Sequence, residues 1–156
     1  MAKKKLKLPD GRTLTFFRLR EQDLPKLIPV YNSVIQEGLY FHRNEGLPDL
    51  KTAQKWYREH VEAGMTFVTA RVGNKIVGGA SLEPGRGKAS HRAILGIYLQ
   101  KEFRNMGIGT RLMKTALETA RERNFEIIWL MVFASNQRAI RLYKKLGFRE
   151  LSLIHI

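Results

Sequence analysis

The sequence from Ile94 to Thr110 reads Ile-Leu-Gly-Ile-Tyr-Leu-Gln-Lys-Glu-Phe-Arg-Asn-Met-Gly-Ile-Gly-Thr. Its mostly apolar beginning predicts a strand, and a short connector follows. Gly107 and Gly109 come just after Arg104, where a long amphipathic helix begins. The first N–H groups of a helix have no partner within the helix, and the helix dipole is positive at that end. Because glycines let a bulky anion approach these N–H groups, the stretch predicts a phosphate-binding site.

Two well-known phosphate motifs do not fit this site. A dinucleotide fingerprint requires a third glycine, but Leu112 occupies that position, and the glycines do not directly follow the strand that ends at Leu99. The motif also lies late in the chain, behind strands that we expect to be antiparallel. A P-loop is excluded because Gly-Lys-Ser/Thr does not occur.

Composition restricts the class of protein further. The chain has 156 residues, enough for one domain, and we expect residues 1–156 to form it. It has no cysteine, so thiolate metal sites are excluded, no other metal is expected, and a cytoplasmic location is the simpler expectation. No apolar run approaches the roughly 20 residues that cross a bilayer, so no membrane partner is expected. The net charge is +14, of which residues 86–156 carry +9, but charge alone is weak evidence for nucleic acid.

Apolar periodicity and turn residues predict the order of the elements. The expected strands are Lys3–Leu8, Arg12–Leu19, Met65–Arg71, Lys75–Glu83, Arg92–Leu99, Glu126–Phe133 and Phe148–Ile154. The expected helices are Glu21–Glu37, Leu50–Ala63, Gly107–Arg123 and a last helix from Ser135 or Asn136 to about Leu146. Short hairpins and strand–helix–strand units both occur in this order. The economical fold is an α/β (α+β) single mixed sheet with helices on both faces.

Four local features carry specific expectations. Pro29 should break or kink the first helix. Asp49 should cap the second helix, and Gly147 should end the last one. The nearly continuous apolar run Glu126–Phe133 indicates a buried central strand.

The motif Arg104-Asn105-Met106-Gly107-Ile108-Gly109 resembles the acetyl-CoA motif of the GNAT acetyltransferase superfamily, Arg/Gln-x-x-Gly-x-Gly/Ala after a strand. A second signature of that family follows at Asn136–Phe148, and the resemblance extends over about residues 12–150. It implies a mostly antiparallel sheet in which the strands Arg92–Leu99 and Glu126–Phe133 splay apart around the pantetheine arm. The Tyr31-Asn32…Trp56 region is similar to phosphinothricin-type and other small-amine acetyltransferases.

The resemblance also implies roles for individual residues. Backbone groups of Leu99 and Lys101 would bind the acetyl and pantetheine amides, Asn136 the pantetheine arm, and Tyr143 would protonate the departing CoA thiolate. The pyrophosphate would bind N–H groups of Arg104, Asn105, Met106, Gly107, Ile108, Gly109 and Thr110. Each role has a simpler alternative: Tyr143 lies on an apolar helical stripe and could pack, Asn136 could be an N-cap, and the Arg104 guanidinium could be a solvated charge.

The general base is harder to assign. Acetyl transfer requires a neutral amine, so a base or a water chain must accept its proton. Some relatives place a glutamate near Ile94, but Arg92–Tyr98 contains no carboxylate. Glu83 is the leading candidate, followed by Glu37 and His91, and direct water-mediated deprotonation stays open.

The sequence therefore predicts an N-acetyltransferase that moves acetyl from acetyl-CoA to a primary amine: a small amine, an amino acid or a protein N-terminus. The acceptor surface would comprise residues 36–49, where Glu37 and Glu45 could attract an ammonium group, and the loop Pro84–His91. The alternatives are a non-catalytic CoA-binding protein or a basic RNA- or ribosome-associated module. Residues 148–156 leave room for one strand where the family has two. The apolar end Leu151–Ile156 thus indicates either a truncated chain or a homodimer that completes the sheet edge.

Overall fold

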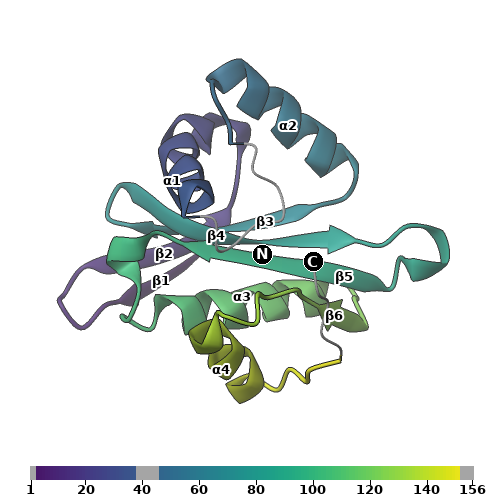
Figure 1. The fold of residues 1–156 in the computed structure, drawn as a ribbon. Helices are drawn as coiled ribbons and strands as arrows, with labels where there is room; N and C mark the ends of the chain where they lie inside the picture. The colour runs from purple at the N-terminus through teal and green to yellow at the C-terminus, as the bar shows by residue number, and fades with distance from the viewer. Residues whose placement is uncertain (1–2, 38–45, 152–156) are drawn as a thin grey trace.

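The computed structural model describes residues 3–37 and 46–151. They form a six-stranded sheet whose strands lie in sequence order from β1 to β6, and Figure 1 shows this sheet between two layers of helices. The strands are β1 (Lys4–Lys7), β2 (Thr13–Arg18), β3 (Thr66–Val72), β4 (Lys75–Pro84), β5 (Arg92–Leu99) and β6 (Ile127–Trp129). Neighbours pair antiparallel up to β5, and β5 pairs with β6 in parallel. The expected mixed, mostly antiparallel sheet is confirmed.

Four helices cover the two faces of this sheet. They are α1 (Leu24–Gln36), α2 (Leu50–Glu62), α3 (Ile108–Glu122) and α4 (Gln137–Lys145). Three 3-10 turns precede or connect the longer elements: η1 (Glu21–Asp23), η2 (Gly87–Ala89) and η3 (Lys101–Phe103). In Figure 1, α1 and α2 lie on one face of the sheet, and α3 and α4 lie on the other.

Alternation along the strands divides the core between the two faces. Phe16 packs on the α3 side, and its neighbour Phe17 packs on the side of α1. Helix α3 buries Ile108, Leu112 and Met113 completely against the first of these cores. Each such side chain stabilises the fold by about 1.5–3 kcal/mol, so the N-terminus of α3 is firmly anchored to the sheet.

Local sequence signals at the helix ends are confirmed. The Asp49 side chain accepts a hydrogen bond from the Thr52 N–H at 2.7 Å and caps α2. Hydrogen bonds from the backbone and side chain of Thr52 lower the pKa of the Asp49 carboxyl because they stabilise its charged form. Gly147 follows α4 with a φ of 97°, a left-handed conformation that glycine adopts without steric cost.

Three expectations about individual elements are wrong. The expected break at Pro29 does not occur, because helix α1 continues through this residue, and the carbonyl that loses its hydrogen bond belongs to Pro25, an exposed residue that water can reach. The run Glu126–Phe133 forms only the short β6, which lies at the edge of the described sheet and exposes Ile127 by 47%. Of the expected strand Phe148–Ile154, residues 148–151 are not in a strand, and the remainder lies outside the described residues.

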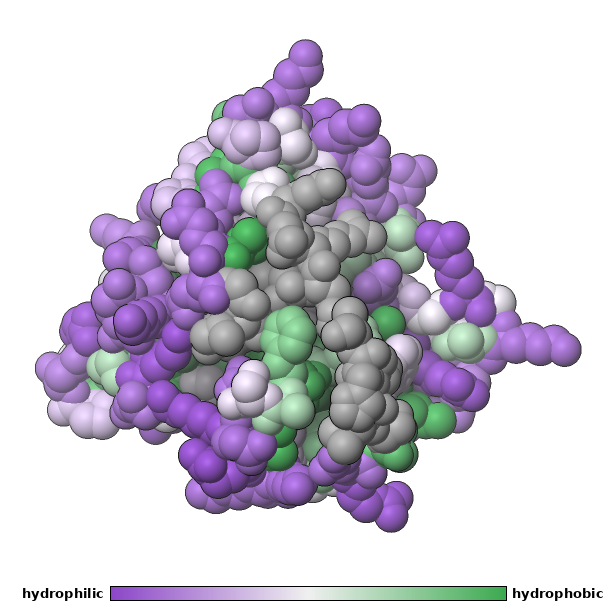
Figure 2. All heavy atoms as spheres, viewed as in Figure 1, coloured by the Kyte–Doolittle hydropathy of each residue, from purple (hydrophilic) through white to green (hydrophobic). Residues whose placement is uncertain are grey.

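Hydrophilic residues dominate the face seen in Figure 2, in keeping with the net charge of +14. Within residues 3–37 and 46–151, none of the helices combines the length and apolar character needed to cross a membrane.

Candidate functional site

Strands β5 and β6 pair with each other only along the first part of β5. Their ladder pairs Arg92 with Ile127 and ends where Ile94 lies opposite Trp129. Strand β5 continues to Leu99, still paired with β4 on its other side. In the described structure, the β5 edge from Ile97 to Leu99 therefore has no strand beside it where β6 would continue. A linear ligand that offers amide groups could pair with this edge as a strand does.

The register shows which β5 backbone groups face this open edge. Gly85 donates its N–H to the Arg92 carbonyl at 3.0 Å, and Gln100 donates to the Val77 carbonyl at 2.8 Å. Because hydrogen-bonded positions alternate in an antiparallel pair, even-numbered β5 residues turn their backbone groups toward β4. The odd-numbered Ile97 and Leu99 turn theirs toward the opening. Sequence reasoning identified Leu99 but missed Ile97, which strand parity could have revealed.

At the far end of the opening, the chain curves into the N-terminus of α3. We call residues 104–110 the cradle loop. Asn105 and Gly107 have left-handed φ values of 66° and 76°. Gly107 is the N-cap and provides no side-chain cap, so the N–H groups of Ile108 to Thr110 point past the end of the helix. Left-handed residues in such a loop gather N–H groups into a concave anion site, and the helix dipole adds positive potential.

The packing leaves space over this turn. A Cβ atom added to Gly109 would meet only Leu142 Cδ2, at 3.9 Å, which is ordinary van der Waals contact. Neither strain nor crowding within the protein therefore requires glycine at position 109. Buried Phe103 and Ile108 hold the loop on both sides, so the open surface belongs to a fixed backbone. This geometry suits a phosphate compound that approaches the N–H groups directly.

The Arg104 side chain ties the cradle loop to two other elements. Its Nε and Nη2 atoms donate to the Leu99 carbonyl at 3.0 and 2.8 Å. Its Nη1 lies 2.8 Å from a carboxylate oxygen of Glu37, and both side chains are about four-fifths buried. The interpretation of this guanidinium as a solvated charge is wrong. It connects α1, the end of β5 and the first residue of the cradle.

The other predicted donor-site residue near β5 is Lys101. It lies in η3, beyond the end of the strand, and its carbonyl accepts the Arg104 N–H at 3.3 Å. The Leu99 N–H thus lies on the open strand edge, and the Leu99 carbonyl is bonded to Arg104. Lys101 belongs to the turn that leads into the cradle loop.

Asn136 is the N-cap of α4, and Tyr143 lies within that helix. The Asn136 Oδ1 atom accepts the Ala139 N–H at 3.2 Å, so the capping interpretation is correct, and the amide nitrogen can still serve another partner. Tyr143 is half-buried among residues packed against the α3-side core, and its ring centroid lies 6.0 Å from that of Phe148. The tyrosine therefore packs in part, and this contact fixes where its ring lies.

The three candidate bases lie in different surroundings. Glu83 is exposed near the end of β4, opposite Ile94, where the β5–β6 ladder stops. Leu82 faces the α3-side core, so Glu83 points to the α1 side of the sheet. Glu37 is held by Arg104. The ring of His91, at the start of β5, accepts a hydrogen bond from Arg92 Nε at 3.2 Å.

An aromatic cluster lies on the α1 side of the sheet. The ring of Tyr31 lies 5.7 Å from that of Trp56 and 5.9 Å from that of Tyr98. A Cβ atom added to Gly79 would come within 3.0 Å of the Tyr98 phenol oxygen, so the glycine makes room for this ring. Burial, and secondarily Tyr31, raise the pKa of Tyr98, so its phenol stays protonated near neutral pH. Sequence reasoning pointed to Tyr31 and Trp56 but did not include Tyr98.

Residues 38–45, which include the predicted acceptor residue Glu45, lie outside the described residues. The segment after them is attached to α1, because the Asn32 side chain donates to the Leu47 carbonyl and accepts the Leu47 N–H, at 2.9 and 2.7 Å. The described residues contain no group of three or more histidine, aspartate or glutamate side chains arranged to hold a metal ion.

A parted strand pair that ends at an uncapped, glycine-bearing helix N-terminus is the arrangement of enzymes that bind an acyl-CoA donor. The comparisons with known proteins agree: residues 30–148 match the acetyltransferase (GNAT) family. The chain belongs to this family. The predictions of the GNAT fold and of an acetyl-CoA-dependent acyltransferase are confirmed.

Individual relatives span most of the chain. It is 25% identical to YwnH of Bacillus subtilis, by its name a candidate phosphinothricin acetyltransferase, over 87% of this chain and 85% of that protein. It is 29% identical to the crystal structure of the ribosomal-protein-alanine N-acetyltransferase from Brucella melitensis, with a TM-score of 0.80 and coverage of 88% and 85%. The fold also matches yncA of Salmonella typhimurium, solved with acetyl-CoA, at a TM-score of 0.77, 18% identity and coverage of 86% and 79%.

Proposed function

We propose that this chain transfers the acetyl group of acetyl-CoA to a primary amine by direct attack, with donor and acceptor bound together. The observation that carries the proposal is the end of the β5–β6 ladder at Ile94 and Trp129, followed along the same edge by the cradle loop. One edge thus offers strand-like backbone groups for amides and helix N–H groups for a pyrophosphate. Acetyl-CoA carries both chemical groups in one linear molecule.

In this proposal, the donor is bound mainly by backbone. The N–H groups of the cradle loop after Arg104, from Asn105 and Met106 to Thr110, hold the pyrophosphate. The predicted Arg104 N–H is not among them, because it already donates to the Lys101 carbonyl. Backbone groups of Ile97 and the N–H of Leu99 bind the pantetheine amides, and the Asn136 amide nitrogen binds the same arm from the N-terminus of α4. The basic half of the chain, with +9 in residues 86–156, favours approach of such an anion.

The chemistry requires three tasks of the protein. Glu83, directly or through a water molecule, accepts a proton from the attacking amine on the α1 side of the sheet. Backbone N–H groups of β5 at the opening stabilise the oxyanion that forms as nitrogen bonds to the thioester carbon. When the carbon–sulfur bond breaks, Tyr143 gives its phenol proton to the thiolate. The acetylated amine and CoA then leave, and water restores the proton to Tyr143.

The acceptor is an amine of a small molecule, an amino acid or a protein N-terminus. Of the relatives named above, YwnH is named for a small-molecule acceptor and the Brucella melitensis enzyme for an alanine of a ribosomal protein. The half-buried rings of Tyr31, Trp56 and Tyr98 lie on the same face as Glu83, and we place the acceptor beside them. Since acetyl-CoA is an intracellular compound, we also propose that the protein acts in the cytoplasm.

The direct test is to incubate the chain with acetyl-CoA and a panel of amines, amino acids and N-terminal peptides, and to measure free thiol. Release of thiol that depends on one class of amine supports the proposal and identifies the acceptor. If acetyl-CoA raises the melting temperature but no amine releases thiol, the chain is a CoA-binding protein without this activity. If acetyl-CoA does not change the melting temperature, the donor assignment is wrong.

We further propose that the chain forms a homodimer through β6. Ile127 and Trp129 of β6 expose 47% and 38% of their surface, Met131 just beyond the strand exposes 47%, and an exposed apolar edge invites pairing. Light scattering at tens of micromolar should then give twice the monomer mass of 18.0 kDa. Trp129→Lys should reduce that mass, whereas a wild-type monomer would refute the proposal.

A further inference from the structure

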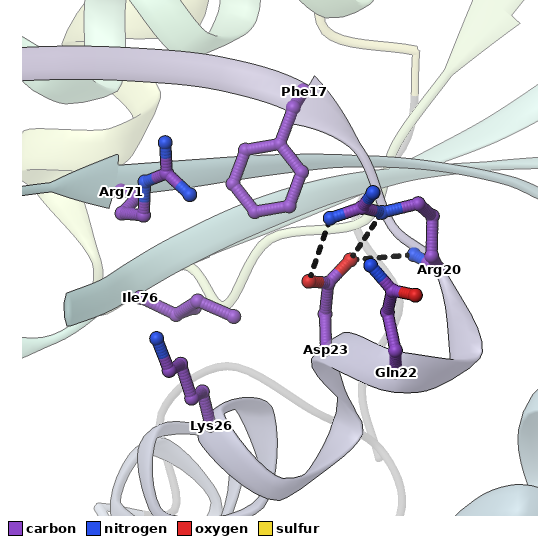
Figure 3. Close-up of a pocket in the computed structure, with 7 residues that line it drawn as sticks. All are labelled: Phe17, Arg20, Gln22, Asp23, Lys26, Arg71 and Ile76. Atoms are coloured by element: carbon purple, nitrogen blue, oxygen red, sulfur yellow. Dashed lines mark hydrogen bonds and ion pairs between the residues drawn. The ribbon is translucent and has the colours of Figure 1, made fainter. Parts of the chain in front are cut away.

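A cavity that is separate from the cradle loop lies between the start of α1 and the sheet. Its volume is about 280 Å³, and its lining comes from β2, η1, α1, β3 and β4. The lining residues are Phe17, Arg20, Gln22, Asp23, Lys26, Arg71 and Ile76. Figure 3 shows Phe17 and Ile76 as its apolar part, with polar side chains around them. None of these residues belongs to the parted strand edge or the cradle.

The charges in this cavity are strongly unbalanced. Arg20, Lys26 and Arg71 are cationic, and Asp23 is the only carboxylate among the lining residues. Asp23 is already engaged by Arg20, since its Oδ2 accepts the Arg20 backbone N–H at 2.9 Å and lies 3.3 Å from Arg20 Nε. The dashed lines in Figure 3 mark this arrangement. Two positive charges therefore remain without a carboxylate among the residues that line the cavity.

The Arg71 side chain is packed against an aromatic ring and has one nitrogen without a hydrogen bond in the described structure. Its guanidinium lies 5.2 Å from the Phe17 ring centroid, and its Nε atom is buried without a hydrogen-bond partner in the described structure. A buried N–H group without an acceptor is costly, and stacking of the guanidinium on an aromatic ring offsets only part of that cost. An oxyanion in the cavity would offset the positive charge of this guanidinium.

The strands direct Arg71 to this place. The register between β3 and β4 shifts between Ala70 and Arg71, so that Arg71 lies opposite Ile76. Such an irregularity re-aims a side chain relative to a regular ladder, and irregularities of this kind are common beside functional sites. The shift places the Arg71 guanidinium beside Phe17 and Ile76 in the wall of the cavity.

We propose that this cavity is a second ligand site, which binds a small organic anion with a phosphate or carboxylate group and an apolar portion. Arg71 and Lys26 bind the oxyanion, and Phe17 and Ile76 contact the apolar portion. The site does not depend on acetyl transfer, and its ligand does not compete with acetyl-CoA.

The test uses phenyl phosphate as the probe, with inorganic phosphate and phenol as its two halves. Thermal unfolding and titration calorimetry are run at constant ionic strength, with the cradle saturated by CoA. Phenyl phosphate should bind more tightly than either half and should raise the melting temperature. Arg71→Gln should weaken its binding about tenfold, the effect expected when a charged hydrogen bond is lost. Lys26→Gln should weaken it less, since Lys26 is exposed.

Lys5→Gln is the matched control, because Lys5 is exposed on β1 and its loss changes the net charge equally. It should bind phenyl phosphate as wild type does, and Arg71→Gln should retain wild-type affinity for acetyl-CoA. Equal binding of phenyl phosphate by wild type and Arg71→Gln would overturn the proposal, as would complete displacement of the probe by CoA. If CoA itself does not bind, the donor assignment is lost, but the comparison of Arg71→Gln with Lys5→Gln still decides this site.

Discussion

Glu37 and Arg104 are 67 residues apart in sequence, yet their side chains form an ion pair with an N–O distance of 2.8 Å. The same guanidinium donates to the Leu99 carbonyl. One arginine therefore fixes the end of β5, the first residue of the cradle loop and the C-terminal end of α1 relative to one another. This contact links the helix beside the proposed acceptor surface to the proposed donor site.

Glu37→Gln should loosen this connection without removing a reacting group. Because a charged hydrogen bond is lost at the cradle, the KM for acetyl-CoA should rise about three- to tenfold while kcat stays nearly unchanged. Steady-state kinetics with varied acetyl-CoA measures both constants, and Glu62→Gln on the exposed end of α2 is the control. A large loss of kcat at constant KM would instead make Glu37 the general base.

Tyr143→Phe removes the proposed acid and keeps the ring that packs near Phe148. Turnover should fall about a hundredfold, the size of effect typical of general acid–base groups, while affinity for acetyl-CoA is preserved. Single-turnover kinetics and calorimetry separate the two quantities. Wild-type turnover in this variant would leave Tyr143 with a packing role alone.

Glu83→Gln tests the proposed base. Without the carboxylate, no side chain at this position accepts the amine proton, so kcat should fall about a hundredfold. Steady-state kinetics at one fixed pH is the measurement. His91→Gln and Glu126→Gln should keep the wild-type kcat. If His91→Gln loses activity and Glu83→Gln does not, the assignment moves to the histidine.

Asn136→Ser separates the capping role from ligand binding. Serine caps a helix about as well as asparagine, so the melting temperature without ligand should hardly change. The shorter side chain has no amide nitrogen to reach the pantetheine arm, so affinity for acetyl-CoA should fall several-fold. Unchanged affinity would show that the hydrogen bond to Ala139 is the whole function of Asn136.

Much of the fold could be predicted because its signals are local. The hairpins, the cap at Asp49 and the glycines at helix ends depend on residues within one or two turns of each other. The cradle loop also belongs to this group, since Gly107 and Gly109 lie next to the helix that they begin.

The features that sequence reasoning missed depend on contacts between distant residues. Residues 126–133 are apolar enough for a central strand, but the pattern does not say how far β6 pairs with β5 or what covers its outer face. The contact between Glu37 and Arg104 joins two charged residues that look individually like surface groups. Arg71 and Tyr98 likewise take their surroundings from three or more elements that only the folded chain brings together.

The central claim is that the N–H groups at the start of α3 bind the CoA pyrophosphate. Gly109→Glu tests it, because a Cβ at this position tilts toward the helix N-terminus and has open space there. An acidic residue in the first turn favours the helix, so the unliganded protein should not melt at a lower temperature. Gly109→Ala is the control, and it should bind acetyl-CoA nearly as wild type does.

The decisive measurement is the affinity of these proteins for acetyl-CoA by titration calorimetry. A carboxylate placed against the pyrophosphate should cost enough free energy to weaken binding about a hundredfold in Gly109→Glu. Wild-type affinity in a folded Gly109→Glu protein would contradict the account, because the pyrophosphate would then bind elsewhere.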